Sequence, residues 1–217
     1  MKIGLITYNV PHKKTQDIML RLLGRDVTVI AMDFQHRKPV KPLYKHRPDM
    51  ITNVSTAELC KYFNFEYIES NTPCEIIKWL DVGIIGGCGL INVNQDVEII
   101  NAHPGVLPHG RGLDALKWSI YNGHPVGVTT HVINNEVDSG LLIDQEIIEV
   151  AFNDSFYSVA MRQYNKEIEM IIKAIDNPNR QKIYNNGSLV NKRMPSEVEI
   201  IMMERFNYLR KKSNKIL

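Results

Sequence analysis

Apolar and polar positions alternate along the first half of the chain with two different periods, which predicts strands and helices in turn. Short apolar runs are typical of buried strands, and apolar positions three and four apart are typical of helices. The strand-like segments are residues 2–7, 27–34, 65–69, 82–87 and 97–103, and the helix-like segments 15–25, 55–63 and 73–80 lie between them. This alternation predicts a parallel sheet covered on both faces.

The pattern changes in the second half of the chain. Its predicted elements are a helix at 113–123, strands at 126–133 and 141–150, a long amphipathic helix at 153–175, a strand or hairpin at 182–190 and a helix at 196–212. We predict an α/β fold with a Rossmann-like, mostly parallel twisted sheet, helices on both faces and antiparallel strands toward the C-terminal half. Residues 1–176 form the main domain, and 177–217 are an appendage packed on it, too short to bury a separate core.

Capping residues mark several of the predicted helix starts. Ser55 is the expected N-cap of its helix, and Asn153 or Asp154 is the expected N-cap of the long helix. Ser196 and Glu199 have the spacing of a capping box, in which each side chain bonds the backbone N–H of the other residue.

Composition and charge narrow the class of protein. The 217 residues include 26 Lys and Arg against 24 Asp and Glu, a net charge of +2 that gives no reason to expect nucleic-acid binding. No apolar run approaches membrane-spanning length, so no membrane partner or export is expected. Cys60, Cys74 and Cys88 lack CxxC spacing, which indicates neither a disulfide framework nor a metal site and fits a reducing cytoplasm.

A polar cluster ends the strand-like segment at 97–103. Side chains two apart on a strand share a face, so Asn101 and His103 converge on one point, and Pro104 and Gly105 end the strand beside them. An amide donor next to an imidazole suits acyl transfer, because one group stabilises an oxyanion and the other handles a proton near neutral pH.

Other polar groups have weaker claims to this site. Asp138 lies in a loop between two predicted strands, where it either orients His103 and raises the pKa of that imidazole, or serves only as a turn residue. His131 either reaches the site or fills the core. The glycines at 86–89 lack the full GxGxxG spacing of a dinucleotide site, and we read them as positions where a flat ligand approaches the backbone.

The motifs around this cluster occur in an order that resembles a known family. That order is Asn101-x-His103-Pro104, Leu107-Pro108-x-x-Arg111-Gly112, Gly127-Val-Thr129 and Val137-Asp138-Ser139-Gly140. It resembles the formyltransferases that use 10-formyltetrahydrofolate, among them glycinamide ribonucleotide formyltransferase, methionyl-tRNA formyltransferase and especially the nucleotide-sugar N-formyltransferases. The resemblance is closest over residues 81–174 and implies that 1–176 is the catalytic domain.

The resemblance implies an enzyme that moves a formyl group from the co-substrate 10-formyltetrahydrofolate to a primary amine. The family's catalytic residues fall on Asn101 and His103, which stabilise the oxyanion, and on Asp138, which orients His103 and a proton-relaying water. The implied folate-binding positions are Gly87, Cys88, Gly89, Leu90, Ile91, Asn134, Asn135, Glu136 and Val137. The candidate acceptor-binding positions are Tyr8, Asn9, Lys13 and Arg111, of which the last is either an anion contact or a structural clamp.

The acceptor amine is less defined than the reaction. Residues 7–15 lack the glycine- and serine-containing loop with which glycinamide ribonucleotide formyltransferase holds a ribose phosphate, and 177–217 is short beside the extra domain of the tRNA enzyme. A nucleotide-linked amino sugar, with a 4-amino-4,6-dideoxy sugar first, is therefore the favoured substrate. The alternatives are a formyltetrahydrofolate hydrolase, transfer to another small amine, and a non-catalytic folate-binding module. A homodimer stays open.

Overall fold

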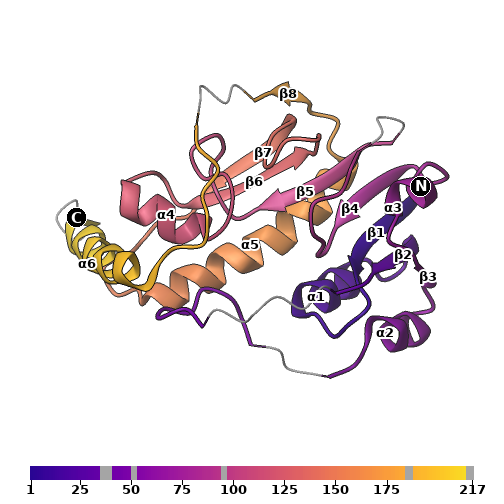
Figure 1. Ribbon diagram of the computed structural model, residues 1–217, viewed down its shortest axis with the longest axis horizontal. Helices are drawn as coiled ribbons and strands as arrows, with labels where there is room; N and C mark the ends of the chain where they lie inside the picture. The colour runs from indigo at the N-terminus through magenta and orange to yellow at the C-terminus, as the bar shows by residue number, and fades with distance from the viewer. Residues whose placement is uncertain (35–40, 50–52, 94–96, 184–187, 214–217) are drawn as a thin grey trace.

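The computed structural model of the protein describes residues 1–34, 41–49, 53–93, 97–183 and 188–213, which form one eight-stranded sheet with helices around it (Figure 1). The strands are β1 (Lys2–Tyr8), β2 (Asp26–Met32), β3 (Glu66–Glu69), β4 (Val82–Ile85), β5 (Ile99–His103), β6 (Gly127–Val132), β7 (Leu141–Ile147) and β8 (Gln181–Lys182). The helices are α1 (Lys13–Arg21), α2 (Thr56–Phe63), α3 (Pro73–Ile77), α4 (Ala115–Asn122), α5 (Phe156–Asp176) and α6 (Ser196–Ser213).

The sheet changes direction at β5. Its strand order is β3-β2-β1-β4-β5-β6-β7-β8, in which the first five strands are parallel and the last three are antiparallel to their neighbours. The prediction of a mostly parallel sheet with antiparallel strands toward the C-terminal half is therefore confirmed. The carboxyl end of β5 lies at the junction between the two halves, the kind of place where open sheets bind ligands.

Apolar side chains cover both faces of the sheet, as alternation along the strands requires. On β1, Ile3 and Leu5 belong to the large core that includes buried residues of α1 and α5, whereas Ile6 points to the opposite face and packs with Ile30 and Ile77. Figure 1 shows α5 running along the sheet beside β4 and β5, with α6 at the opposite end of the molecule from β1–β3. Helices thus flank both faces, as predicted.

The helix starts agree with the predicted caps at only one of three places. Ser55 caps α2 in a complete capping box with Glu58. The long helix α5 is capped by Ser155, one residue beyond the predicted pair, because the Asp154 carboxylate is used by Arg162 and the Ala151 N–H instead. The predicted capping box at the start of α6 is wrong.

The reason is that Glu199 points into the protein. Its carboxylate accepts hydrogen bonds from the Lys117 ammonium at 2.9 Å and from the Tyr44 backbone N–H at 3.0 Å, and the Lys117 and Glu199 side chains are buried. A buried charge is tolerated only when it is paired and hydrogen-bonded, so this ion pair holds α6 against α4. Met202 and Phe206 on the same helix lie in the large core, and α6 is therefore packed on the rest of the chain.

Some predictions fall outside the described residues or remain untested. The predicted strand or hairpin at 182–190 includes residues 184–187, which lie outside the described part of the chain, and β8 itself pairs with β7. The division of the chain at residue 176 stays a prediction. In the described ranges, no helix is both long enough and apolar enough to cross a bilayer.

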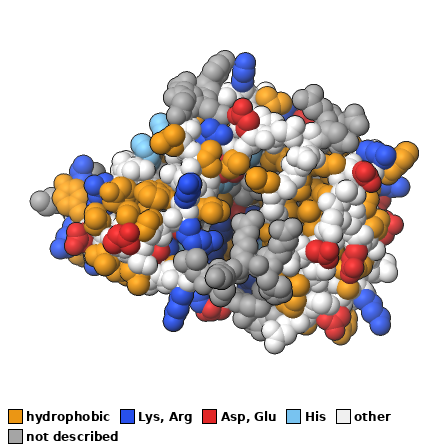
Figure 2. Space-filling model, in the orientation of Figure 1, with side chains coloured by type: hydrophobic (Ala, Val, Ile, Leu, Met, Phe, Trp, Pro, Cys, Tyr) orange, Lys and Arg blue, Asp and Glu red, His pale blue; other side chains and the backbone are white. Residues whose placement is uncertain are grey.

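Hydrophobic side chains gather at the α6 end of the face shown in Figure 2. The exposed apolar side chains that α6 carries are Ile200, Ile201 and Tyr208. The homodimer stays a prediction.

The buried ion pair predicts a large loss of stability when one partner is removed. Glu199→Ala leaves the Lys117 ammonium buried without its carboxylate and is expected to lower the free energy of unfolding by about 3–5 kcal/mol. The double variant Lys117→Met, Glu199→Leu is expected to recover much of that loss, because no buried charge remains. Urea unfolding of the three proteins tests both statements; equal stability of Glu199→Ala and the original protein would contradict them.

Candidate active site

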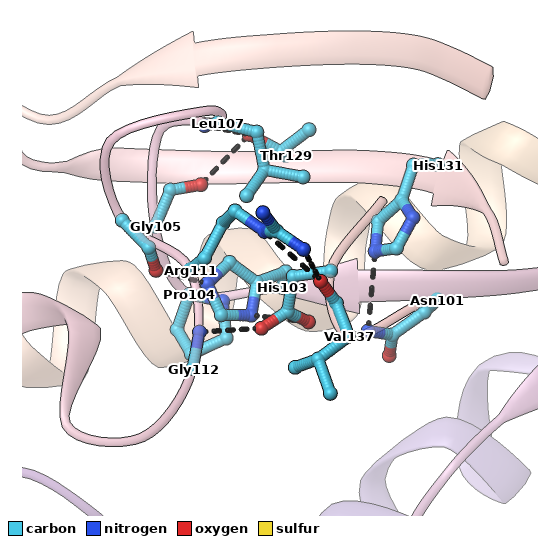
Figure 3. Close-up of polar contacts among 12 residues, drawn as sticks. Asn101, His103, Pro104, Gly105, Leu107, Arg111, Gly112, Thr129, His131 and Val137 are labelled. Carbon is cyan, nitrogen blue, oxygen red and sulfur yellow. Dashed lines mark hydrogen bonds and ion pairs between the residues drawn. The ribbon is translucent and has the colours of Figure 1, made fainter. Parts of the chain in front are cut away.

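Four polar side chains lie on one face of the sheet where β5 meets β6. The antiparallel register places Asn101 opposite His131 and His103 opposite Thr129. Residues two apart on a strand point to the same side, so each strand contributes two members to the group. Figure 3 shows these side chains together with the loops that follow the two strands. The predicted convergence of Asn101 and His103 thus includes two partners from β6.

His103 is held as a cation between two acceptors. Its Nδ1 lies 3.1 Å from the Asp138 carboxylate and its Nε2 lies 2.5 Å from the Gly110 carbonyl oxygen. A carbonyl only accepts, so Nε2 carries a hydrogen, and a hydrogen on Nδ1 then completes the bond to the carboxylate. The side chain is buried, and although burial lowers the pKa of His103, the Asp138 carboxylate and the Gly110 carbonyl together raise it above its usual value.

Asp138 is correspondingly held as an anion. Burial raises the pKa of its carboxyl, but the His103 imidazolium and the Gly112 N–H outweigh that effect and bring the pKa below its usual range. One carboxylate oxygen faces His103 and the other accepts the Gly112 N–H at 2.6 Å. The backbone of Asp138 lies in the left-handed region with φ +45°, a strained conformation for a non-glycine residue. The sequence prediction placed this carboxylate beside His103, and the structure does so.

His131 is neutral and orients Asn101. Its Nδ1 lies 2.8 Å from the Ser139 carbonyl oxygen, so Nδ1 carries the hydrogen and Nε2 has a lone pair. Nε2 accepts a hydrogen bond of 3.4 Å from the Asn101 amide nitrogen, which fixes which way that carboxamide is turned (Figure 3). Burial, followed by the charge of His103, lowers the pKa of His131 to about 4. Of the two open roles for His131, the structure therefore favours contact with the site.

Thr129 fixes the turn that follows β5. Its hydroxyl donates to the Gly105 carbonyl at 2.7 Å and accepts the Leu107 N–H at 3.1 Å. Gly105 lies so close to the His103 ring that an added Cβ would stand 2.8 Å from Nε2 and 2.7 Å from the Gly110 oxygen. The turn therefore fits only a glycine here, and it brings the Gly110 carbonyl onto the imidazole.

Arg111 is a structural clamp. Its guanidinium donates two hydrogen bonds to the Val137 carbonyl, at 3.0 and 2.7 Å, and one to the Ser188 carbonyl at 3.2 Å. The side chain is buried, so these bonds satisfy donors that have little access to water. Of the two roles left open for Arg111, these contacts favour the structural clamp, in which the guanidinium holds the residue before Asp138.

The loops predicted to bind folate are joined to each other. The Asn135 carboxamide accepts the Val93 N–H at 2.9 Å and donates to the Val93 carbonyl at 3.4 Å, so this predicted ligand contact is a bridge between the loops. Gly87 is approached by a protein ring, since an added Cβ would lie 2.6 Å from His12. An added Cβ on Gly89 would meet open space, so of these two glycines Gly89 is the one whose backbone a flat ligand can approach.

Other predicted folate contacts differ in exposure. Leu90 is 84% exposed, whereas Cys88 and Ile91 are partly buried and pack against the smaller core. Burial raises the pKa of the Cys88 thiol to about 11, which does not favour a reactive thiolate. The Asn134 side chain accepts the Glu136 N–H in a local turn.

The predicted acceptor side lies at the end of β1. The Tyr8 ring packs edge-on against His12 and Phe34, and the Asn9 amide donates to Asp33 at 3.0 Å. Lys13 pairs with Asp17 on its own helix.

The lysine that follows Lys13 on α1 is less exposed than Lys13. The Lys14 ammonium lies 2.6 Å from the buried Glu167 carboxylate, which also pairs with the half-exposed Arg47 guanidinium, so Lys14 belongs to a partly buried ionic group. Among the described residues, no cluster of three His, Cys, Asp or Glu side chains is arranged to hold a metal ion.

The sequence did not predict the backbone groups that hold the charged side chains of this site. The Gly110 carbonyl and the Gly112 N–H are such groups, and the residue type does not show that they have this role. The Gln145 side-chain amide donates a partly buried hydrogen bond of 3.0 Å to the Thr129 hydroxyl beside the turn. Gly112 and Thr129 stand in the motifs that carry the resemblance, and Thr129 and His131 are two apart on one strand like Asn101 and His103, but neither signal assigned these residues a role.

One family model matches the part of the chain that contains these side chains. Residues 87–175 match the family model described as "Formyl transferase". Residues 87–175 form a formyl transferase domain. This segment contains the whole of the cluster on β5, β6 and the Asp138 loop.

Two curated relatives of the formyl transferase domain come from bacteria. The dTDP-4-amino-4,6-dideoxyglucose formyltransferase of Mycobacterium tuberculosis is 31% identical over 115 residues, 53% of this chain and 47% of the relative. The methionyl-tRNA formyltransferase of Fusobacterium nucleatum is 28% identical over 182 residues, 80% of this chain and 56% of the relative. The chain thus spans about half the length of these relatives.

Among solved structures, an N-formyltransferase from Helicobacter canadensis, in complex with folinic acid and dTDP-3-aminofucose, has a TM-score of 0.67 at 17% identity and covers 98% of this chain and 82% of its own. A 4-N formyltransferase from Francisella tularensis has a TM-score of 0.62 at 23% identity and covers 94% and 87%. At these identities the likenesses show only that the chain has the same fold as these structures.

The charge states of the two histidines are directly measurable. In a histidine NMR titration, His103 is expected to stay protonated above pH 6.5, whereas His131 is expected to be neutral at pH 7 with its hydrogen on Nδ1. Because the pKa of His103 is higher in the folded state, its protonation stabilises the fold fully below about pH 6.5, and this contribution is lost as pH rises through the folded pKa. Asp138→Asn is expected to lower the pKa of His103; an unchanged titration would contradict the ion pair.

The turn after β5 gives a second prediction. Gly105→Ala places a methyl group against both the His103 ring and the Gly110 carbonyl, so the hydrogen bond between them is expected to break and the pKa of His103 to fall. Gly123→Ala is a matched control, since its added Cβ meets nothing within 4 Å, although its φ of +72° carries strain of its own. If the His103 titration is the same in Gly105→Ala and the original protein, the described packing is wrong.

Proposed function

We propose that the protein transfers a formyl group from 10-formyltetrahydrofolate to the primary amine of a nucleotide-linked amino sugar. One observation carries the proposal: a buried imidazolium–carboxylate pair, His103 and Asp138, lies beside the oriented amide of Asn101 within the formyl transferase domain. These are an amide donor, a fixed positive charge and an anion, the groups that acyl transfer to an amine requires.

Each of the three residues has a distinct role in the proposed reaction. His131 uses one amide hydrogen of Asn101, and the other hydrogen is the donor for the oxygen that becomes negative. The charge of His103 stabilises the same oxygen, while its two N–H groups hold the ring between Asp138 and Gly110. Asp138 keeps His103 protonated and accepts, through a water, the proton that the amine loses.

The two loops joined by Asn135 are the proposed site of the folate. The backbone around Gly89 borders open space, and the residues from Ile91 to Val93 face the Asn134–Val137 loop through the Asn135 bridge. Such a pair of loops fits a flat ring that is read by backbone groups. 10-Formyltetrahydrofolate supplies the formyl carbon, whose bond to the folate nitrogen is exchanged for a bond to the acceptor nitrogen while one proton passes from the amine to the folate nitrogen.

The proposed acceptor rests on the relatives and on the end of β1. A relative in Mycobacterium tuberculosis is named for a dTDP-4-amino-4,6-dideoxyglucose, and a structural neighbour is described with dTDP-3-aminofucose. At the end of β1, the rings of Tyr8 and Phe34 lie 5.0 Å apart beside the polar pair of Asn9 and Asp33. An aromatic pair next to polar groups suits a base and a sugar.

Removing any of the three central groups is expected to abolish transfer. Asn101→Ala is expected to lower kcat by about a hundred- to a thousand-fold, the usual effect of losing one oxyanion donor. His103→Ala removes the positive charge and Asp138→Ala removes the proton acceptor, and each is expected to cost at least about a hundred-fold in kcat. Turnover is measured with 10-formyltetrahydrofolate and a panel of dTDP-amino sugars. Asn122→Ala, on the exposed end of α4, is the matched control and is expected to keep full activity.

The same assay separates transfer from hydrolysis. Formate release is measured with and without the amino sugars: release that does not depend on the amine would favour the hydrolase. Near-normal turnover in all three alanine variants, with unchanged circular dichroism, would refute the proposed site. Folate binding with neither reaction would favour a non-catalytic module.

A further inference from the structure

We propose that residues 188–194 are a positioning segment of the active site, whose backbone holds Asp138 against His103. This segment lies outside the residues matched by the family model, and it reaches the site through the loop that contains Arg111 and Gly112. The inference rests on the proposed function only in taking Asp138 as a catalytic group.

The segment pairs with the loop as a short parallel strand. The Asn191 N–H donates to the Arg111 carbonyl at 3.0 Å, and the Leu113 N–H donates to the Asn191 carbonyl at 2.9 Å, which makes a bridge between Gly112 and Asn191. In such a bridge the residue between the two bonded positions directs its own N–H to the opposite side. That residue is Gly112, and its N–H donates to the Asp138 carboxylate at 2.6 Å.

A second connection runs through Arg111. Its guanidinium joins the Ser188 carbonyl to the Val137 carbonyl, the residue immediately before Asp138. Through Arg111 the segment therefore holds the backbone just before Asp138, and through Gly112 it holds one of the Asp138 carboxylate oxygens. Because Asp138 lies in the left-handed region, its conformation persists only where surrounding bonds hold it.

Contacts on the far side fix the segment itself. The Trp118 indole N–H donates to the Lys192 carbonyl at 2.7 Å, and the Met194 N–H donates to the Asp114 carboxylate at 3.0 Å. The Met194 side chain is buried in the large core. The segment is thus fixed on α4 and the loop before it. Because it also bonds the loop that contains Gly112, it fixes the position of Asp138.

The fit between the segment and the loop is tight. An added Cβ on Gly112 would lie 2.3 Å from the Asn191 carbonyl oxygen and 2.6 Å from its nitrogen, and Gly112 has a φ of +89°. In contrast, Leu189 on the same segment is 84% exposed. Backbone groups, rather than side chains, therefore carry the positioning.

The test separates the backbone of Asn191 from its side chain. Asn191→Pro removes the N–H that bonds Arg111, whereas Asn191→Ala keeps it; Leu189→Ala is a second control on the exposed side. The proline variant is expected to lose at least about ten-fold in kcat with little change in KM, because a displacement of about 1 Å can cost up to about a hundred-fold. The two alanine variants are expected to stay within about two-fold of the original protein, since neither removes a bond that positions Asp138.

A second readout does not depend on turnover. Since Asp138 raises the pKa of His103, histidine NMR of Asn191→Pro is expected to show that pKa shifted down, and Asn191→Ala is expected to match the original protein. A folded proline variant with unchanged kcat and an unchanged His103 pKa would overturn the inference. If it does not fold, a backbone ester at Asn191, which replaces that N–H by an oxygen, decides between the same two outcomes.

The two readouts keep this inference apart from the proposed function. If the original protein transfers no formyl group but the His103 pKa falls in Asn191→Pro, the positioning role stands and the proposed function fails. If transfer is seen and Asn191→Pro changes neither quantity, the proposed function stands and the positioning role fails.

Discussion

The rest of the site depends on one buried ion pair, between His103 and Asp138. A buried imidazolium is costly unless acceptors satisfy both of its N–H groups, and here Asp138 satisfies one and the Gly110 carbonyl the other. Each of these two acceptors has its own support. The Thr129 hydroxyl fixes the turn that places Gly110, and Gly112 and Arg111 hold Asp138 and the residue before it. The charge on one ring thereby accounts for the tight turn after β5 and for the strained backbone at Asp138.

Two histidines on neighbouring strands have opposite charge states, and their hydrogen-bond partners explain why. His103 faces a carboxylate and a carbonyl, so it is favoured as a cation. His131 faces one carbonyl and one amide donor, so its neutral form alone fits both, and the nearby charge of His103 lowers its pKa further. The neutral His131 ring fixes the orientation of the Asn101 amide, and the charged His103 ring places a positive charge beside that amide. A strand pair thus sets two different electrostatic roles with the same residue type.

Much of this could be predicted from the sequence, and the misses have physical causes. The strands and their alternating faces follow from apolar periodicity, and Ser55 is a correct cap because a capping box is local. Glu199 also has capping-box spacing, but its carboxylate pairs with the buried Lys117 ammonium instead, because a buried charge without a partner costs more than a missing helix cap. Arg111 and Asn135 have the chemistry of ligand contacts, yet their partners are backbone groups of distant loops. A local sequence pattern gives the wrong role for a side chain when a residue far along the chain bonds the same polar atom in the folded protein.

The sequence by itself determined the fold class, the strand that carries Asn101 and His103, and the pairing of their side chains on one face, because these depend on short-range periodicity and on chain direction. Only the tertiary structure decided the protonation of His103 and His131, the role of Arg111 and the contribution of residues 188–194. Those properties depend on which carbonyl and N–H groups lie within hydrogen-bond distance after folding. Every residue except proline carries the same backbone N–H and carbonyl groups, so the positions of these groups become known only with the three-dimensional arrangement of the loops.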